Sequence, residues 1–280
     1  MVFGGETAES YYDEGVTASM RGDVAQAVQY FEKALQLDPY YVACYHQLGR
    51  CKVRQGALQE AVECFYRVIK ARPHLIPPRL DLAFALLEGG NTKRAAEAFD
   101  AVAAEKPENP RAMQGLAACA FAEGDWARAC ALATQAVNLG GANFATLYLQ
   151  ARAARLAGNT VLAAEAFDEA GALLEKLAES NPDQPEPYYL RGELQFARLN
   201  FAAALDAYQA AENRMADRTH YYSFGEHFDI TDVLEKRGMC LLRLDRLADA
   251  RALGREIREI KPRSRIAAVL LGEAGDAPAP

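Results

Sequence analysis

The segment at 219–230, THYYSFGEHFDI, gathers side chains that could bind a metal ion. Imidazole nitrogens and carboxylate oxygens are common zinc ligands, and this segment offers four such residues: His220, Glu226, His227 and Asp229. Their spacing matches no known ligand motif, so a metal-dependent activity here is the least favoured hypothesis. The preferred interpretation is a loop whose aromatic side chains pack on neighbouring helices, because clustered surface aromatics are normally packed or used for contact.

Other catalytic chemistry has little support in the sequence. No G-x-S-x-G, P-loop, H-E-x-x-H or strand-linked G-x-G-x-x-G motif is present. Carboxylate pairs such as Glu165 and Asp168 occur at helical spacing, which is typical of a solvated helix face. The sequence therefore predicts a protein that is not an enzyme and that uses no cofactor or metal.

Charge and hydropathy exclude further classes of partner. The formal net charge is -7, whereas nucleic-acid binding requires a basic stripe, so nucleic-acid partners are not expected. The first residues lack the basic and apolar regions of a secretory leader, and no uncharged apolar run long enough to span a bilayer occurs. We therefore expect a soluble cytoplasmic protein with no membrane insertion.

A period of 34 residues organises the chain. The clearest unit, 42–75, has two apolar helix patterns joined by a glycine turn and closed by a proline. Its marker residues are Tyr45, Leu48, Gly49, Gly56, Ala61, Phe65 and Pro73. The same offsets in the preceding and following units hold Gly15, Gly22, Ala27, Phe31 and Pro39, and then Ala83, Gly90, Ala95, Phe99 and Pro107.

Seven units follow from this pattern: 8–41, 42–75, 76–109, 110–143, 144–177, 185–218 and 231–264. Insertions at 178–184 and 219–230 separate the later units. The first insertion is about two helical turns long, so the second helix of 144–177 is predicted to lengthen without rotating its apolar face. A capping helix is predicted at 265–272, and the ends are predicted to be an N-terminal tail at 1–7 and a disordered tail at 273–280.

The period and marker residues resemble the tetratricopeptide repeat family. The resemblance implies an all-α fold, a right-handed α-solenoid of seven helix-turn-helix units with a C-terminal capping helix. Packing explains these marker residues. Small residues at positions eight and twenty of each unit let its two helices approach closely, and an aromatic residue at position 24 fills the gap between them. The turn glycines end the first helices. Cys51, Cys119 and Cys240 share the tenth position with small core residues, so packing is predicted for the cysteines.

The resemblance also implies a concave groove lined by the first helix of each unit. Its groove positions hold Tyr12, His46, Arg50, Leu80, Phe84, Arg111, Gln114, Phe121, Tyr148, Arg152, Arg155, Tyr189, Glu193 and Phe196. Aromatic and arginine side chains dominate interface hot spots, and none of these residues is predicted to be needed for the repeat core. The carboxylate clamp of chaperone-binding members is absent, since its places hold Tyr12, Val16, Gln47, Pro77 and Asp81.

Two hypotheses about function remain beside the metal-dependent one. The favoured hypothesis is a non-catalytic adaptor or scaffold that binds a peptide segment or a partner protein in the groove. Arginines that alternate with aromatic residues would suit a partner with acidic residues beside aromatic or aliphatic anchors. The alternative is a structural subunit that self-associates, possible as a homo-oligomer, into a larger assembly.

Overall fold

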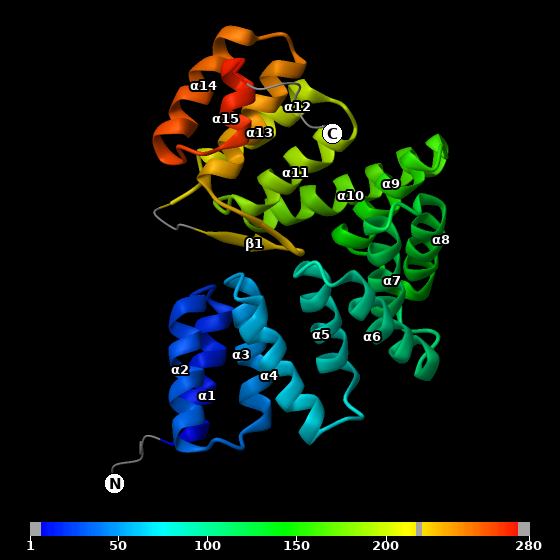
Figure 1. Ribbon diagram of the computed structural model, residues 1–280, viewed down its shortest axis with the longest axis vertical. Helices are drawn as coiled ribbons and strands as arrows, with labels where there is room; N and C mark the ends of the chain where they lie inside the picture. The colour runs from blue at the N-terminus through cyan, green and yellow to red at the C-terminus, as the bar shows by residue number, and fades with distance from the viewer. Residues whose placement is uncertain (1–6, 217–219, 274–280) are drawn as a thin grey trace. The chain divides into compact units, whose positions relative to one another are not determined.

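The computed structural model describes residues 7–216 and 220–273, which divide into two compact units at 1–141 and 142–280 (Figure 1). The all-α fold class is confirmed, since helices dominate both units. The predicted tails lie almost wholly outside the described residues, with only Thr7 and Glu273 inside them. Thr7 caps the first helix, where its side chain accepts a hydrogen bond from the backbone N–H of Ser10.

The first unit is a row of helix pairs in which each second helix packs on the first helix of the next pair. Its helices are α1 Ala8–Met20, α2 Val24–Leu37, α3 Val42–Arg54, α4 Leu58–Ala71, α5 Ile76–Glu88, α6 Thr92–Glu105, α7 Pro110–Ala122 and α8 Trp126–Ala136. A wide π-helical turn, Val137–Gly141, follows α8 and ends where Gly140 adopts a left-handed conformation.

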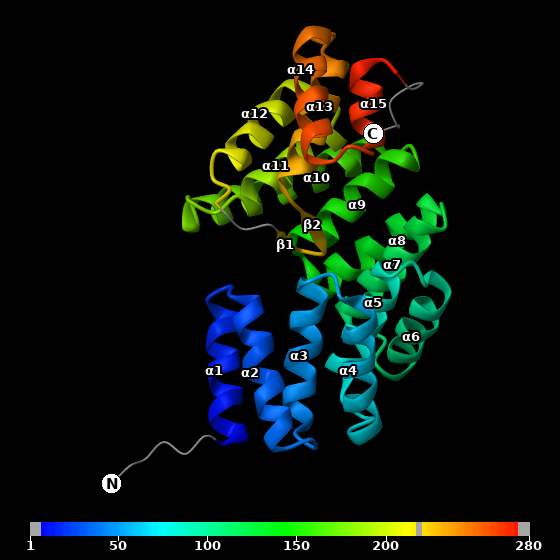
Figure 2. The same cartoon turned by 60° about the vertical axis from the view of Figure 1, so that its left-hand side comes forward.

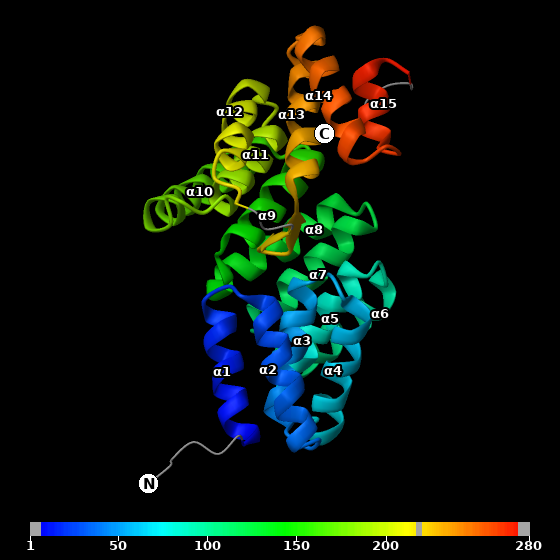
Figure 3. The same cartoon turned by 90° about the vertical axis from the view of Figure 1, so that its left-hand side faces the viewer.

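The second unit repeats the arrangement and adds a β-hairpin. It contains α9 Phe144–Leu156, α10 Thr160–Ser180, α11 Glu186–Ala197, α12 Phe201–Glu212, β1 Tyr221–Ser223, β2 Glu226–Phe228, α13 Ile230–Arg243, α14 Leu247–Ile260 and α15 Arg265–Leu271. The predicted lengthening is confirmed, because α10 has 21 residues where α2 and α4 have 14 each (Figure 3).

The turns inside the pairs follow the predicted glycine rule. Gly22, Gly56, Gly90, Gly124 and Gly158 all have φ between 73° and 84°. In two later pairs Leu199 and Asp245 replace glycine, yet they keep the left-handed conformation, with φ of 63° and 58°. The turn geometry therefore belongs to the repeat, and these two residues adopt it at a steric cost.

The core packs aromatic rings against helix backbone. A Cβ added to Gly15 would lie 2.6 Å from the ring of Phe31, and one added to Gly49 would lie 2.6 Å from Phe65. Phe99 differs, because Ala83 occupies the usual glycine place in its unit. Its ring lies instead over Gly115 of the next pair, where an added Cβ would be 2.2 Å away.

The cysteines and the predicted cap fit this packing. Five of the six cysteines are buried, so the packing role predicted for the cysteines is confirmed at these five, whereas Cys130 is half-buried. Helix α15 packs on α13 and α14, with Leu270 2% exposed. No helix within the described ranges is both long and apolar enough to span a membrane.

Candidate functional site

In the first unit, one acidic residue links the first helices of three successive pairs. Asp81 on α5 accepts hydrogen bonds from His46 Nε2 on α3 at 2.8 Å and from Arg111 Nη2 on α7 at 2.7 Å. Burial alone would raise the pKa of Asp81, but the hydrogen bonds from His46 and Arg111 lower it below its ordinary value. Asp81 is thus a charged carboxylate that fixes the positions of two predicted groove residues.

Beside this network lies a mixed aromatic and cationic surface. The Arg111 guanidinium lies 5.4 Å from the ring centroid of Phe84, which is a cation–π distance. Phe84 in turn meets Phe99 edge to face at 4.8 Å. Arg50, one turn after His46, is exposed and forms no hydrogen bond or ion pair with the described part of the chain.

The side chains of several other predicted groove residues in the first unit pack against neighbouring residues, either partly or completely. Tyr12 lies 5.0 Å from Tyr41, and Phe121 meets Trp126 edge to face at 4.9 Å. Gln114 is half-buried. Leu80 is only 2% exposed, so the expectation that no groove residue serves the repeat core is wrong at this position.

In the second unit, two predicted groove tyrosines belong to the core. Tyr148 and Tyr189 are 8% and 3% exposed, because their rings pack against other aromatic residues. The Tyr148 hydroxyl donates to the backbone carbonyl of Glu193 at 3.2 Å. For Tyr148 and Tyr189 too, the expectation of a residue free of core packing is wrong.

The remaining groove positions of the second unit surround these tyrosines. The Arg152 guanidinium lies 5.3 Å from the Tyr148 ring. The Nε of Arg155 is buried and has no hydrogen-bond partner among the described residues. Phe196 meets Phe201 edge to face at 5.3 Å. Arginine side chains therefore lie next to aromatic rings on this surface, and the role of these residues as a groove stays a prediction.

The insertion forms the β1–β2 hairpin and lies on this surface (Figure 2). Phe224 and Gly225 make the turn, with φ of 50° and 87°. Phe228 stacks on Tyr189 of α11, with ring centroids 3.9 Å apart and planes at 5°. Phe224 meets Phe144 of α9 edge to face at 5.7 Å. The hairpin thus contacts first helices, and β2 also packs on α13.

The carboxylate of Glu226 on β2 lies within electrostatic reach of the Glu193 carboxylate on α11. Glu193 Oε1 accepts from the Tyr208 hydroxyl and from Lys236 Nζ, both at 2.6 Å. Burial raises the pKa of Glu226, the Glu193 carboxylate raises it further, and Lys236 and Arg152 oppose the shift. Glu226 therefore resists ionisation in the folded state.

We expect Glu226→Gln to stabilise the second unit at neutral pH. The folded state holds the Glu226 proton more tightly than the unfolded state, so this carboxyl lowers stability as pH rises from its ordinary pKa of 4.5 through the raised folded value. Glutamine keeps the shape without the charge, so the free energy of unfolding at pH 7 should rise. Urea unfolding at pH 7 and pH 4 measures it. The gain should vanish at pH 4, and the exposed control Glu165→Gln should show none.

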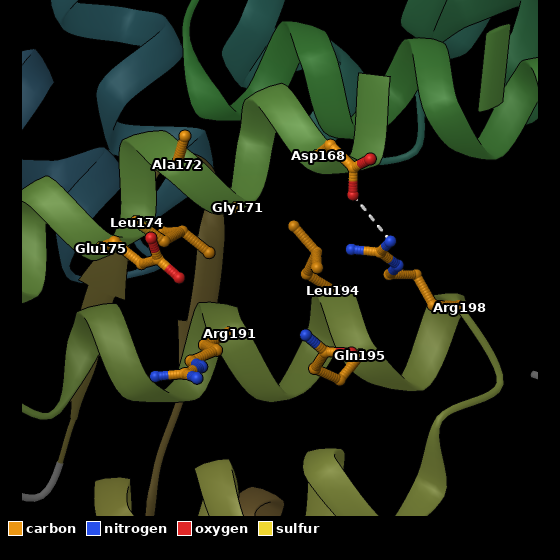
Figure 4. A pocket seen from close by; sticks show the side chains of 9 residues that line it. All are labelled: Asp168, Gly171, Ala172, Leu174, Glu175, Arg191, Leu194, Gln195 and Arg198. Atoms are coloured by element: carbon orange, nitrogen blue, oxygen red, sulfur yellow. Dashed lines mark hydrogen bonds and ion pairs between the residues drawn. The ribbon is translucent and has the colours of Figure 1, made fainter. Parts of the chain in front are cut away.

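A notch of about 170 Å³ lies between α10 and α11 (Figure 4). Gly171 lies at its floor, and an added Cβ there would meet no atom within 4 Å. The equivalent residues of the four earlier units are all larger: Leu35, Ile69, Ala103 and Val137. Asp168 and Arg198 form an ion pair of 2.7 Å at its edge. The notch is the space left by a missing side chain.

The residues predicted as possible metal ligands only partly converge. His220 Nε2 and His227 Nδ1 are 2.7 Å apart. Asp229 instead caps α13, where its side chain accepts from the backbone N–H of Asp232 at 3.0 Å. In residues 7–216 and 220–273, no three histidine, cysteine or acidic side chains gather closely enough to hold a metal ion.

Sequence reasoning did not identify Asp81 or Phe228 as members of these surfaces. Asp81 is one position away from the predicted groove positions, although it was singled out as the residue at a clamp place. The hairpin had a signal in the sequence, since two short aromatic runs flank Phe224 and Gly225. The cross-strand pairs Tyr221 with Phe228 and Tyr222 with His227 confirm that the aromatic runs pair.

Stacked helix pairs with linked first helices define an α-solenoid of the class that typically serves as an interaction scaffold. Two profiles described as Tetratricopeptide repeat match the chain, one at 18–74, 53–118 and 86–153 and the other at 156–218. These matches span well over half of the chain, so it belongs to the tetratricopeptide repeat family.

Known proteins resemble the chain mainly in fold. An uncharacterized protein of Methanocaldococcus jannaschii is 50% identical over 34 residues, which is 12% of this chain and 40% of that protein. A crystal structure of a tetratricopeptide repeat protein from Parabacteroides merdae has a TM-score of 0.57 at 17% identity and covers 96% of this chain and 99% of its own. The 41-end fragment of MamA from Desulfovibrio magneticus RS-1 has a TM-score of 0.51 at 22% identity, covering 61% and 97%.

Proposed function

We propose that this chain is a non-catalytic adaptor whose first unit binds a peptide segment or partner protein on its first-helix surface. The binding surface is formed by α3, α5 and α7. Its contact residues are Arg50, Phe84, Arg111, Gln114 and Phe121.

The observation that carries this proposal is the Asp81 network. A single carboxylate bonded to His46 and Arg111 holds side chains from three successive helix pairs at one place. Such pre-organisation lowers the entropy lost when a ligand binds. The Arg111 side chain remains 48% exposed, so it is still accessible to a ligand while it is bonded to Asp81.

The chemistry of this surface favours acidic partner segments with aromatic or aliphatic anchors. Arg50 offers an unpaired guanidinium, and arginine binds carboxylates with a planar fork of donors. Phe84 and Phe121 offer partly exposed rings on α5 and α7, the first helices of the next two pairs. A cytoplasmic location belongs to the proposal, because six free cysteines persist most readily in a reducing compartment. Cell fractionation tests the location.

We expect the double variant Arg50→Ala with Arg111→Ala to bind its partner at least tenfold more weakly. A charge-assisted hydrogen bond contributes about 1.5 to 3 kcal/mol, and loss of Arg111 also leaves Asp81 to repel an acidic ligand. Proteins retained by the immobilised wild-type chain are identified by mass spectrometry, and peptides from their acidic segments are titrated by calorimetry.

The matched control is Arg21→Ala with Arg72→Ala, which removes two exposed arginines at the ends of α1 and α4. It should bind like wild type. Equal affinities of the groove variant and the control would reject the proposed surface. A dominant homo-oligomer in light scattering, with no retained protein, would favour the self-associating subunit instead.

A further inference from the structure

The hairpin places one aromatic side chain, Phe228, against the first helices of the second unit, as a bound peptide would. Phe228 is fully buried between Tyr189, at 3.9 Å, and Tyr221, at 5.3 Å. Tyr189 lies on α11 and is backed by Tyr208 at 5.8 Å. Aromatic pairs at these distances contribute more than their buried area alone. The first-helix surface of this unit therefore contains a site for one aromatic side chain.

An acidic residue accompanies this anchor. Side chains alternate along a strand, so Glu226 shares a face with Phe228 two positions later. Arg152, Arg155, Glu193 and Glu226 all lie close enough to influence the Tyr148 hydroxyl, whose pKa is raised mainly by burial. Lys236 and Arg152 favour the charged form of Glu226, but burial and the Glu193 carboxylate outweigh them and raise its pKa.

Several features make this segment a replaceable occupant. It lies outside the 34-residue period, so the repeat pattern does not require it. Its strands have three residues each, and a hairpin of that size has little stability of its own. The turn residue Phe224 remains 45% exposed, and Glu226 lies beside the like charge of Glu193.

We propose that Glu226–Phe228 is the chain's own copy of a ligand, and that the α9–α11–α13 surface binds extended partner segments that carry an aromatic residue in the place of Phe228. The partner segment displaces the hairpin and takes over the site of Phe228 on Tyr189. This site is separate from the first-unit surface proposed above, and it extends the adaptor to a second, self-occupied surface. The hairpin competes with the partner segment for this site. The apparent affinity for the partner segment is therefore reduced to the extent that the hairpin occupies the site.

The test uses a fluorescein-labelled peptide, HYYSFGEHFD, which copies residues 220–229, and the full-length chain. Fluorescence anisotropy should show at least tenfold tighter binding to Phe228→Ala than to wild type, because the variant lacks the competing anchor. A peptide whose last phenylalanine is alanine should bind at least tenfold more weakly. Tyr189→Ala should abolish the gain seen in the Phe228→Ala background. A folded Phe228→Ala chain that binds no better than wild type overturns the proposal.

Hydrogen exchange in the wild-type chain provides a readout that does not depend on the stability of Phe228→Ala. A saturating concentration of the peptide should increase amide exchange at 221–228 while α11 stays protected. Unchanged protection of the hairpin with peptide bound, or no binding by wild type and the milder Phe228→Leu variant, overturns the proposal. The variant Arg50→Ala with Arg111→Ala should bind this peptide like wild type, so failure of either proposal can be told from failure of the other.

Discussion

A chain that ends at Ser264 is expected to lose roughly 3 to 5 kcal/mol of stability in its second unit. The truncation removes α15, whose Ala267 and Leu270 are 0% and 2% exposed. Removal of one buried leucine already costs about 2 to 5 kcal/mol. It would also uncover Ile257, which is fully buried on α14, so the terminal stacking face would meet water.

Helix α15 fits closely enough that no shift of α13 and α14 can replace it. A Cβ added to Gly238 would lie 2.4 Å from Leu270, and one added to Gly254 would lie 3.0 Å from it. We expect the melting temperature to fall by roughly 10 °C or more, measured by circular dichroism. The control is a chain that ends at Glu273, which keeps α15, the hydrogen bond from the Glu273 N–H to the Ala268 carbonyl and the Arg258–Glu273 ion pair, and which should melt like wild type. An unchanged melting curve for the shorter chain would show that α15 is no cap.

The second large effect is expected from Gly115→Ala, which should destabilise the first unit by about 1 to 3 kcal/mol. The new Cβ would lie 2.2 to 2.5 Å from three ring atoms of Phe99. Phe99 is fully buried and already packs against Phe84, so its ring has little room to move. Overpacking of this size in a closely packed core costs about that much.

The matched control is Gly171→Ala in the middle of α10. Its Cβ would meet no atom within 4 Å, so the methyl group enters open space. Alanine also favours the helix over glycine by about 0.5 to 1 kcal/mol, and a small gain in stability is expected. Urea unfolding of both variants measures the contrast. If both changes had the same sign, helix propensity and not ring contact would govern these positions.

The helix pairs could be predicted because their determinants are local and periodic. Gly22 and its equivalents each end a first helix, and Phe31, Phe65 and Tyr208 each pack on a glycine of their own pair. The length of α10 followed from counting turns. The wide turn after α8 was not predicted, since nothing in the pattern around Val137 distinguishes it from a continued helix.

The candidate surfaces were harder to predict, because position within a repeat does not determine burial. Arg50 and Tyr189 occupy groove positions, yet one is exposed and the other is 3% exposed. Arg50 and Tyr189 also hold different positions in their repeats, and part of the cover over Tyr189 comes from Phe228, which belongs to an insertion outside the period. The linking role of Asp81 was not predicted for a related reason. It depends on His46 and Arg111, which lie 35 and 30 residues away in the chain.

The displaced ring of Phe99 limits how this chain can be shortened or recombined. The Phe99 ring of the unit at 76–109 fills the space above Gly115 of α7. This unit and α7 are therefore complementary in shape. Removal of 76–109 would bring α7 against Phe65, whose ring lies over Gly49 of its own pair. Gly115 would then face a hole of the size of a phenyl ring. Removal of 42–75 leaves this complementary pair intact, so repeats of equal length are not equally exchangeable.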